Sequence, residues 1–254
     1  MCCFTGPITS VSHTRIFARR TPDGRQYLVY SMDLDTPVEV AMALPIPVPA
    51  GTPENAVRFI DLEAHPGFLE TIILAWPVRP SKSAGDPTPA AAPAPGAAPL
   101  KVEEVGAFAA SFVPTIGDFA RLDERFRLPG SVWDKLPQYR AFGFVVFKLR
   151  AGRTDVHPMA FSFPHAQSTT LFFPTVHIHD GTVHARADFD RELYLQAPLL
   201  GAAAAGGEWI ESEMIARQLE GATDYPGLLA PEQHLHKRRL IGEFANGDIV
   251  VPLG

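Results

Sequence analysis

Three histidines around one predicted turn are the residues of this chain most suited to chemistry. They lie between Phe172 and Ala185, where His177, His179 and His184 flank the dipeptide Asp180-Gly181. An Asp-Gly pair between two runs of alternating polar and apolar residues favours a β-hairpin with a two-residue loop. The segment is therefore predicted to be a hairpin that carries a row of imidazoles.

In such a hairpin, His177 pairs directly with His184, and His179 lies two residues along the same face of its strand. Directly paired Cβ atoms are ~4.5–5.5 Å apart, so the three rings could hold one metal ion. Imidazole nitrogens suit zinc, copper and iron. The alternative is a solvated histidine face, with Ile178 and Val183 turned to the core. A shift of the turn by one residue would break the three-histidine face.

The spacing of these histidines resembles the first metal motif of the cupins. His177 and His179 supply the His-x-His pair, and His184 stands where that motif has glutamate. No glycine stands six residues before His177, which is a second departure from the motif. The resemblance covers about ten residues and implies a metal ion held by imidazoles.

Two adjacent cysteines at the start of the chain, Cys2 and Cys3, offer further chemistry. Removal of Met1 would leave Cys2 with a free amine of pKa ~7.7–8.0 beside its own thiol, which is the arrangement of a catalytic nucleophile and its base. Alternatively, the Cys2 and Cys3 thiolates join the histidines, because sulfur and imidazole together favour zinc or copper. The third interpretation is that both are small buried apolar residues.

The Met-Cys start is similar to that of cysteine amidohydrolases of the N-terminal-nucleophile class, and the run Phe17-Ala18-Arg19 is a further point of similarity. This resemblance implies an amide hydrolase with Cys2 as the nucleophile. Asp33, Asn55 and Arg19 are then the candidates for its partner residues.

Composition narrows the classes of function. The chain has 254 residues and a net charge of −6, which argues against a nucleic-acid-binding protein. No run reaches the ~18 apolar residues of a membrane helix, and the start lacks the pattern of a signal peptide. Adjacent cysteines do not pair with each other readily, which favours a reducing compartment. We expect a cytoplasmic protein whose partner is a small-molecule or peptide substrate, or another protein, and neither a nucleic acid nor a membrane.

The elements that would position these groups are mostly strands. Apolar and β-branched runs predict strands, and Pro22-Asp23-Gly24 predicts a turn between the first two. Short helices are expected at 65–74, 116–126, 131–136 and 208–219, and a closing hairpin over 245–248. The predicted fold class is α+β, mainly antiparallel β with a few short helices.

One segment stands apart from the predicted elements. Residues 80–99 are mostly proline, alanine, serine and glycine, a composition that does not repay the entropy of ordering. We interpret it as a flexible insertion within a single domain that spans residues 1–254.

Three functions follow from the sequence. The first is a metal-dependent enzyme, hydrolytic or oxidative, that uses the histidine hairpin and the N-terminal cysteines. The second is the amide hydrolase with Cys2 as nucleophile. The third is a non-enzymatic binding or accessory protein, with residues 80–99 and the proline-rich Pro45–Pro49 run as its contact surfaces.

Overall fold

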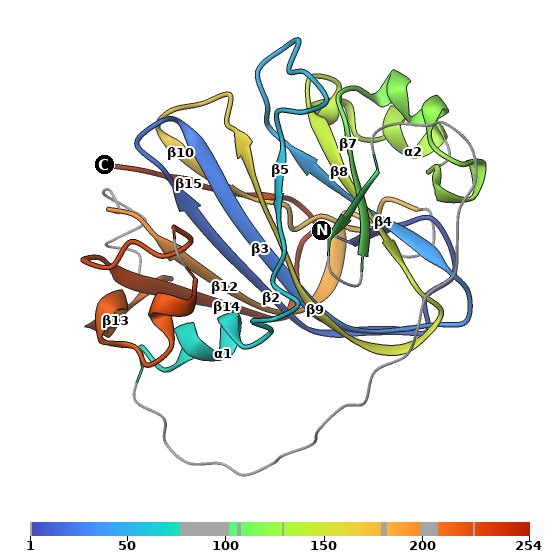
Figure 1. Ribbon diagram of the computed structural model, residues 1–254. Helices are drawn as coiled ribbons and strands as arrows, with labels where there is room; N and C mark the ends of the chain where they lie inside the picture. Colours follow the sequence, from blue (N-terminus) through green and yellow to red (C-terminus); the bar gives the residue numbers. More distant parts are fainter. Residues whose placement is uncertain are drawn as a thin grey trace.

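The computed structural model of the chain describes residues 2–76, 102–105, 108–128, 130–178, 182–198, 208–225 and 227–254. Its strands form two large sheets and one small sheet (Figure 1). No helix among these residues is long and apolar enough to cross a membrane.

The larger sheet has seven strands. In spatial order they are β13 (Ile210–Ile215), β14 (His234–Ala245), β12 (Arg186–Gln196), β2 (Ser10–Arg20), β3 (Arg25–Thr36), β9 (Gly152–Pro164) and β5 (Arg58–Ile60). Neighbours pair antiparallel except β12 and β2, which are parallel.

The second sheet has six strands, and its order places the N-terminal strand near one edge. The order is β11 (His177–Ile178), β1 (Cys2–Phe4), β4 (Val40–Ile46), β8 (Gly143–Leu149), β7 (Phe108–Val113) and β6 (Glu103–Val105). Here β1 and β11 are parallel. The small sheet pairs β10 (Thr170–Phe173) with β15 (Ile249–Pro252).

Helices are few and short. They are α1 (Phe68–Ile73), α2 (Gly130–Asp134) and the 3₁₀ turns η1 (Ile116–Arg121), η2 (Glu124–Phe126), η3 (Pro137–Tyr139), η4 (Ala216–Gln218) and η5 (Ala222–Asp224). The chain is therefore mostly β with a few short helices, as predicted. Its sheets are mixed, because each large sheet contains a parallel pair.

The first predicted hairpin is confirmed. Strands β2 and β3 pair antiparallel, and the turn between them is closed by hydrogen bonds from Thr21 N to Arg25 O and from Gly24 N to Thr21 O. Gly24 has a φ of 82°, a left-handed conformation that favours glycine.

Two expectations about the C-terminal half are wrong. The region predicted as a helix over 208–219 forms strand β13 and turn η4, because its backbone pairs with β14 at the sheet edge. The predicted closing hairpin does not form either, since β14 lies in the seven-stranded sheet and β15 pairs with β10.

The expected helix at 65–74 is present as α1. The predicted insertion at 80–99 lies outside the described residues, and the single domain stays a prediction.

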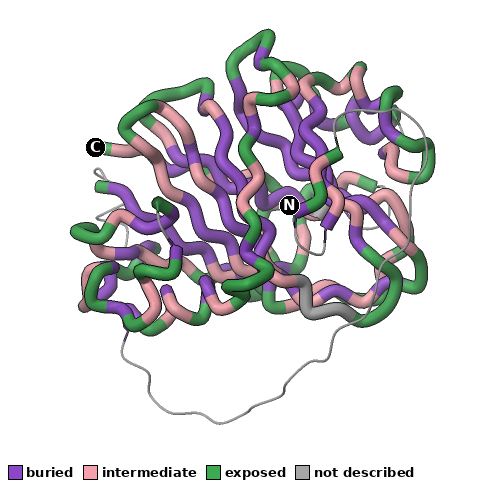
Figure 2. The backbone as a smooth tube through the Cα atoms, viewed as in Figure 1, coloured by how far each residue is buried: buried purple, intermediate pink, exposed green. Residues whose placement is uncertain are grey.

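The core explains why β2 and β3 each have an apolar centre, Ile16-Phe17-Ala18 and Leu28-Val29-Tyr30. Ile16 and Leu28 face a large apolar cluster that also contains residues of the six-stranded sheet, so the two sheets share this core. Phe17 and Val29 point to the opposite face and pack under α1, where the rings of Phe17 and Phe68 are 5.3 Å apart. Both faces of these strands are covered, and Figure 2 shows the resulting burial along them.

The proline-rich run at Pro45–Pro49 is not the exposed contact surface that the sequence suggested. Pro45, Pro47 and Val48 are buried, and only Pro49 is exposed. Pro45 lies on β4 next to β8, beyond the pairs that β1 makes with β4. A proline is tolerated there because its missing N–H has no neighbouring strand to bond.

A buried histidine joins this run to the first hairpin. The N–H of His165 donates to Gly24 O (3.2 Å), and the next N–H, from Ala166, donates to Pro47 O (2.8 Å). His165 is 8% exposed, and its Nε2 has no hydrogen-bond partner among the described residues. Burial, with the nearby positive charge of Arg20, lowers the pKa of His165 to about 4.

This burial predicts a specific acid sensitivity. In the unfolded chain a histidine takes up its proton near pH 6.5, whereas folded His165 stays neutral until about pH 4. The free energy of unfolding should therefore fall between these values, by roughly 3 kcal/mol in total. Denaturant titrations of the protein and of His165→Gln at pH 6.5 and 4.5 measure this, and the variant should lose less stability on acidification. His65→Gln, at an exposed position, is the control. Equal losses in all three proteins would contradict the assignment.

Candidate functional site

The structure brings one predicted cysteine and one predicted histidine to neighbouring positions. Strand β1 lies between β4 and β11, with Cys2 in register with His177 and Cys3 in register with Ile178. The Cys3 side chain is fully buried in the core, as the third interpretation of the cysteines expected. Only the backbone of Cys2 is described, so its role as a nucleophile stays a prediction.

His177 is already engaged by a cation. Its Nδ1 lies 2.9 Å from Nη2 of Arg191. A guanidinium can only donate, so the imidazole nitrogen accepts and its lone pair is used. A metal ion at this ring would have to bind at Nε2, beside a fixed positive charge.

The predicted pairing of His177 with His184 is not what joins their two segments. Strand β11 ends at Ile178, and residues 182–185 are not in a strand. Instead, Asn246 Nδ2 donates to the carbonyls of both His177 and His184 (2.9 Å each), while its Oδ1 accepts from His177 N (2.7 Å). The side-chain amide of Asn246 thus makes the hydrogen bonds that cross-strand backbone pairing would make in a hairpin.

Within the described part of the chain, no three histidine, cysteine, aspartate or glutamate residues are grouped as metal ligands. His179 and the predicted loop Asp180-Gly181 lie outside the described residues. The bound zinc, copper or iron ion therefore stays a prediction, and its proposed ligands are only partly placed.

A buried arginine is the centre of the polar cluster that surrounds β11. Arg191 of β12 is 2% exposed, and its Nη1 donates to Thr175 O. The guanidinium also lies over the ring of Phe189, 4.5 Å from its centroid. Burying a charge is costly unless hydrogen bonds and an opposite charge compensate it.

An aspartate binds the other end of the same peptide segment. The Asp248 carboxylate accepts from Thr175 N (2.8 Å), Val176 N (3.1 Å) and Tyr139 Oη (2.5 Å). Burial raises the pKa of Asp248, and the hydrogen bond from Tyr139 opposes that rise. Arg191 and Asp248 thereby hold the two polar ends of Thr175, which makes the arrangement a rigid anchor for β11 and its partner β1.

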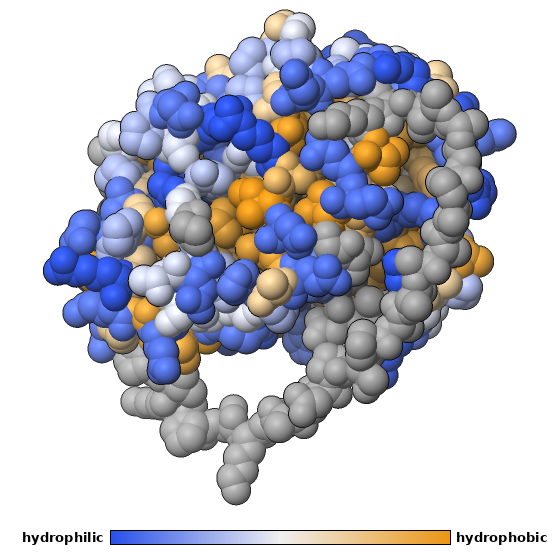
Figure 3. Space-filling model, in the orientation of Figure 1, coloured by the Kyte–Doolittle hydropathy of each residue, from blue (hydrophilic) through white to orange (hydrophobic). Residues whose placement is uncertain are grey.

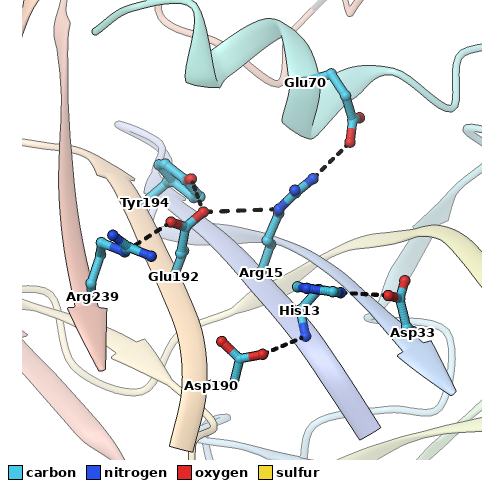
Figure 4. Close-up of polar contacts among 8 residues, drawn as sticks. All are labelled: His13, Arg15, Asp33, Glu70, Asp190, Glu192, Tyr194 and Arg239. Atoms are coloured by element: carbon cyan, nitrogen blue, oxygen red, sulfur yellow. Dashed lines mark hydrogen bonds and ion pairs between the residues drawn. The ribbon is translucent and has the colours of Figure 1, made fainter. Parts of the chain in front are cut away.

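A second polar network lies on the outer face of the seven-stranded sheet (Figure 4). Glu192 accepts from Tyr194 Oη (2.7 Å) and pairs with Arg239 (3.1 Å) and, more distantly, Arg15 (3.9 Å). Arg15 also donates to Glu70 of α1 (2.7 Å). The network ties α1 to three strands, and α1 ends shortly before the start of the undescribed residues 77–101.

An unusual backbone position borders this network. His13 has a φ of 49°, and the register of β2 against β3 shifts around it. Its N–H donates to Asp190 (3.0 Å), and its Nδ1 lies 2.6 Å from the Asp33 carboxylate. The hydrogen bond to Asp33 raises the pKa of His13. A strained, hydrogen-bonded bulge of this kind is a fixed feature of the sheet surface.

Sequence reasoning missed Arg191, Asp248 and the role of Asn246. Asn246 and Asp248 were interpreted only as turn residues. A signal for Arg191 was present, because Phe189, Leu193 and Leu195 alternate along β12 and place the arginine on the same apolar face. A charged residue at such a position predicts a buried polar cluster.

The anchor predicts a large effect for one substitution. Asp248→Ala removes the acceptor of three donors, and each unsatisfied buried donor costs about 1–3 kcal/mol. The free energy of unfolding should fall by about 3 kcal/mol or more. The control is Asp188→Ala, at an exposed position of β12, where a change within about 0.5 kcal/mol is expected. Urea titrations of both variants decide, and equal midpoints would contradict the anchor.

Comparisons with known proteins identify the fold. No protein-family model and no curated protein matches the sequence. Among solved structures, baculovirus P35 matches over 98% of this chain and 99% of its own length, with a TM-score of 0.52 and 11% identity. P35 in its complex with caspase-8 matches over 95% of this chain and 96% of its own, with a TM-score of 0.51 and 10% identity.

These matches show a shared fold, not a shared activity, because the identities are low. They nevertheless correct the first functional interpretation. The chain has the fold of P35 over nearly its whole length, so the prediction of a metal-dependent enzyme built on a zinc- or copper-binding histidine hairpin is wrong. At His177 itself, Nδ1 accepts from Arg191 and the backbone is bound by Asn246.

Proposed function

We propose that this protein acts by binding another protein, and that its partner is a protease of the caspase class, which it inhibits. The observation that carries the proposal is the end-to-end similarity to P35, a protein whose structure is known in a complex with caspase-8 and after caspase cleavage. A match over nearly the whole of both chains favours a common mode of action more than a match of one motif would.

The surface supports a protein partner. Figure 3 shows apolar residues gathered at the centre of one face, where β5 runs in Figure 1, with hydrophilic residues around them. An apolar centre with a polar rim is the usual anatomy of a protein interface. The small-molecule or peptide substrate predicted from the sequence has no such support.

The predicted contact segment at 80–99 is the part of the chain that we assign to the partner. Its composition favours an accessible, extended segment, and such segments dock readily in clefts that bind extended peptides. Helix α1, which precedes this segment in the sequence, is held on the sheet through the Glu70–Arg15 pair.

The proposal is tested by mixing the purified chain with active caspase-8 and measuring the remaining cleavage of a fluorogenic peptide. Activity should fall as the chain is added in increasing molar ratio, and the two proteins should co-elute on size exclusion. Unchanged activity and separate elution at a large excess of the chain would contradict the proposal.

A variant locates the contact. Replacing residues 80–99 by a glycine-serine linker of equal length should abolish inhibition and complex formation, because the linker keeps the reach but not the side chains. Its thermal midpoint should match that of the parent protein. The control is Pro49→Ala, the exposed end of the other predicted contact run, which should inhibit as well as the parent. Full inhibition by the linker variant would exclude the segment as the contact.

A further inference from the structure

A cavity beside α2 is not used by the polar networks or by the proposed protease contact. It has a volume of about 440 Å³ and is lined by Thr115, Ile116, Gly117, Gly130, Trp133, Asp134 and Arg140. This volume lies within the ~300–1,000 Å³ of ordinary small-molecule sites. The lining comes from Thr115 and the start of η1, from α2 and from the residue after η3.

Two opposite charges line the cavity. The Asp134 carboxylate and the Arg140 guanidinium are both on exposed residues, and neither pairs with another side chain of the described residues. Two other exposed arginines do form ion pairs, Arg121 with Glu54 and Arg125 with Asp123. An unpaired cation and an unpaired anion in one cavity leave both charges available to a ligand.

The floor and wall between the charges are apolar. Trp133 is 4% exposed, and its ring packs against Phe119 and Phe144 with centroids 5.0 and 4.7 Å away, which fixes its position. Its indole N–H has no hydrogen-bond partner among the described residues. Ile116 is half-buried and supplies the second apolar surface.

The remaining lining residues add an acceptor and free space. The Thr115 hydroxyl donates to Asp118 (2.7 Å), so its oxygen lone pairs are open to a ligand N–H. A Cβ added at Gly130 would meet nothing within 4 Å, and one at Gly117 would meet only Thr115 Oγ1, at 3.6 Å. The glycines therefore leave room that side chains would otherwise occupy.

We propose that this cavity binds a free α-amino acid with an apolar side chain. Arg140 pairs with the ligand carboxylate, Asp134 pairs with the ammonium group, and the side chain lies on Trp133 and Ile116. A ligand with only one charge would make only one of the two ion pairs, so a zwitterion makes the better fit. The proposal is independent of the protease contact.

The test is calorimetric titration of the full chain, without any protease, with L-phenylalanine. Saturable binding is expected, with N-acetyl-L-phenylalanine, L-phenylalanine amide and glycine each at least about tenfold weaker, since each lacks one of the three contacts. No saturation with phenylalanine up to roughly 10 mM would overturn the proposal, as would equal binding of the two singly charged analogues.

Variants assign the site. Arg140→Gln and Asp134→Asn should each weaken phenylalanine binding about tenfold or more at an unchanged thermal midpoint, because both residues are exposed. Lys135→Gln, an exposed lysine next to Asp134 that does not line the cavity, is the matched control and should bind as the parent does. Gly130→Leu should block binding by filling the cavity. Parent-like affinity in all the lining variants would place the ligand elsewhere and overturn the assignment.

Discussion

Besides their shared apolar core, the two sheets are joined by one buried set of hydrogen bonds, in which Arg191 and Asp248 hold opposite ends of Thr175. Arg191 belongs to β12 of the seven-stranded sheet, whereas the segment that it holds leads into β11 of the six-stranded sheet. Asp248 follows β14 and reaches Tyr139, which lies just before β8. Buried polar groups require hydrogen-bond partners, and here the partners come from several distant parts of the chain. These hydrogen bonds help to fix how the sheets meet.

Strand β1 pairs with β4 on one side and with the anchored strand β11 on the other. Three residues make too few ladder hydrogen bonds to hold a chain end in place, but the partner β11 is fixed by Arg191, Asp248 and the Asn246 amide. The buried Cys3 side chain adds apolar contact. Strand β1 is therefore a part of the core, held by β4 about 40 positions further along and by β11 about 175 positions further along.

A fold can be shared at about one-tenth identity when its constraints are of this kind. The apolar alternation of strands such as β2 and β3 tolerates exchange among apolar residues, and the turn at Gly24 needs only a residue that accepts a positive φ. Exposed residues tolerate still more exchange, because the fold constrains them less. Asp134 and Arg140 of the α2 cavity are exposed, so they are places where this protein can differ in function from others of its fold.

What the sequence determined by itself was local. Proline and glycine placed the β2–β3 turn, apolar periodicity indicated most strands, and composition marked residues 80–99 as different from the rest. The predictions of the turn and of these strands are correct because the residues that determine a turn or an alternating strand lie within a few positions of one another. The helix expected at 208–219 failed for the converse reason, since backbone pairing with β14 at the sheet edge outweighs a local preference.

Only the tertiary structure decided what the chemical groups do. The spacing of the three histidines predicts a metal site because a hairpin that binds a metal ion would have the same spacing. Whether His177 faces a metal or a guanidinium depends on Arg191, fourteen positions away, and on Asn246 beyond it. A side chain's partners are set by contacts that close long loops of chain, and no spacing within a motif encodes them.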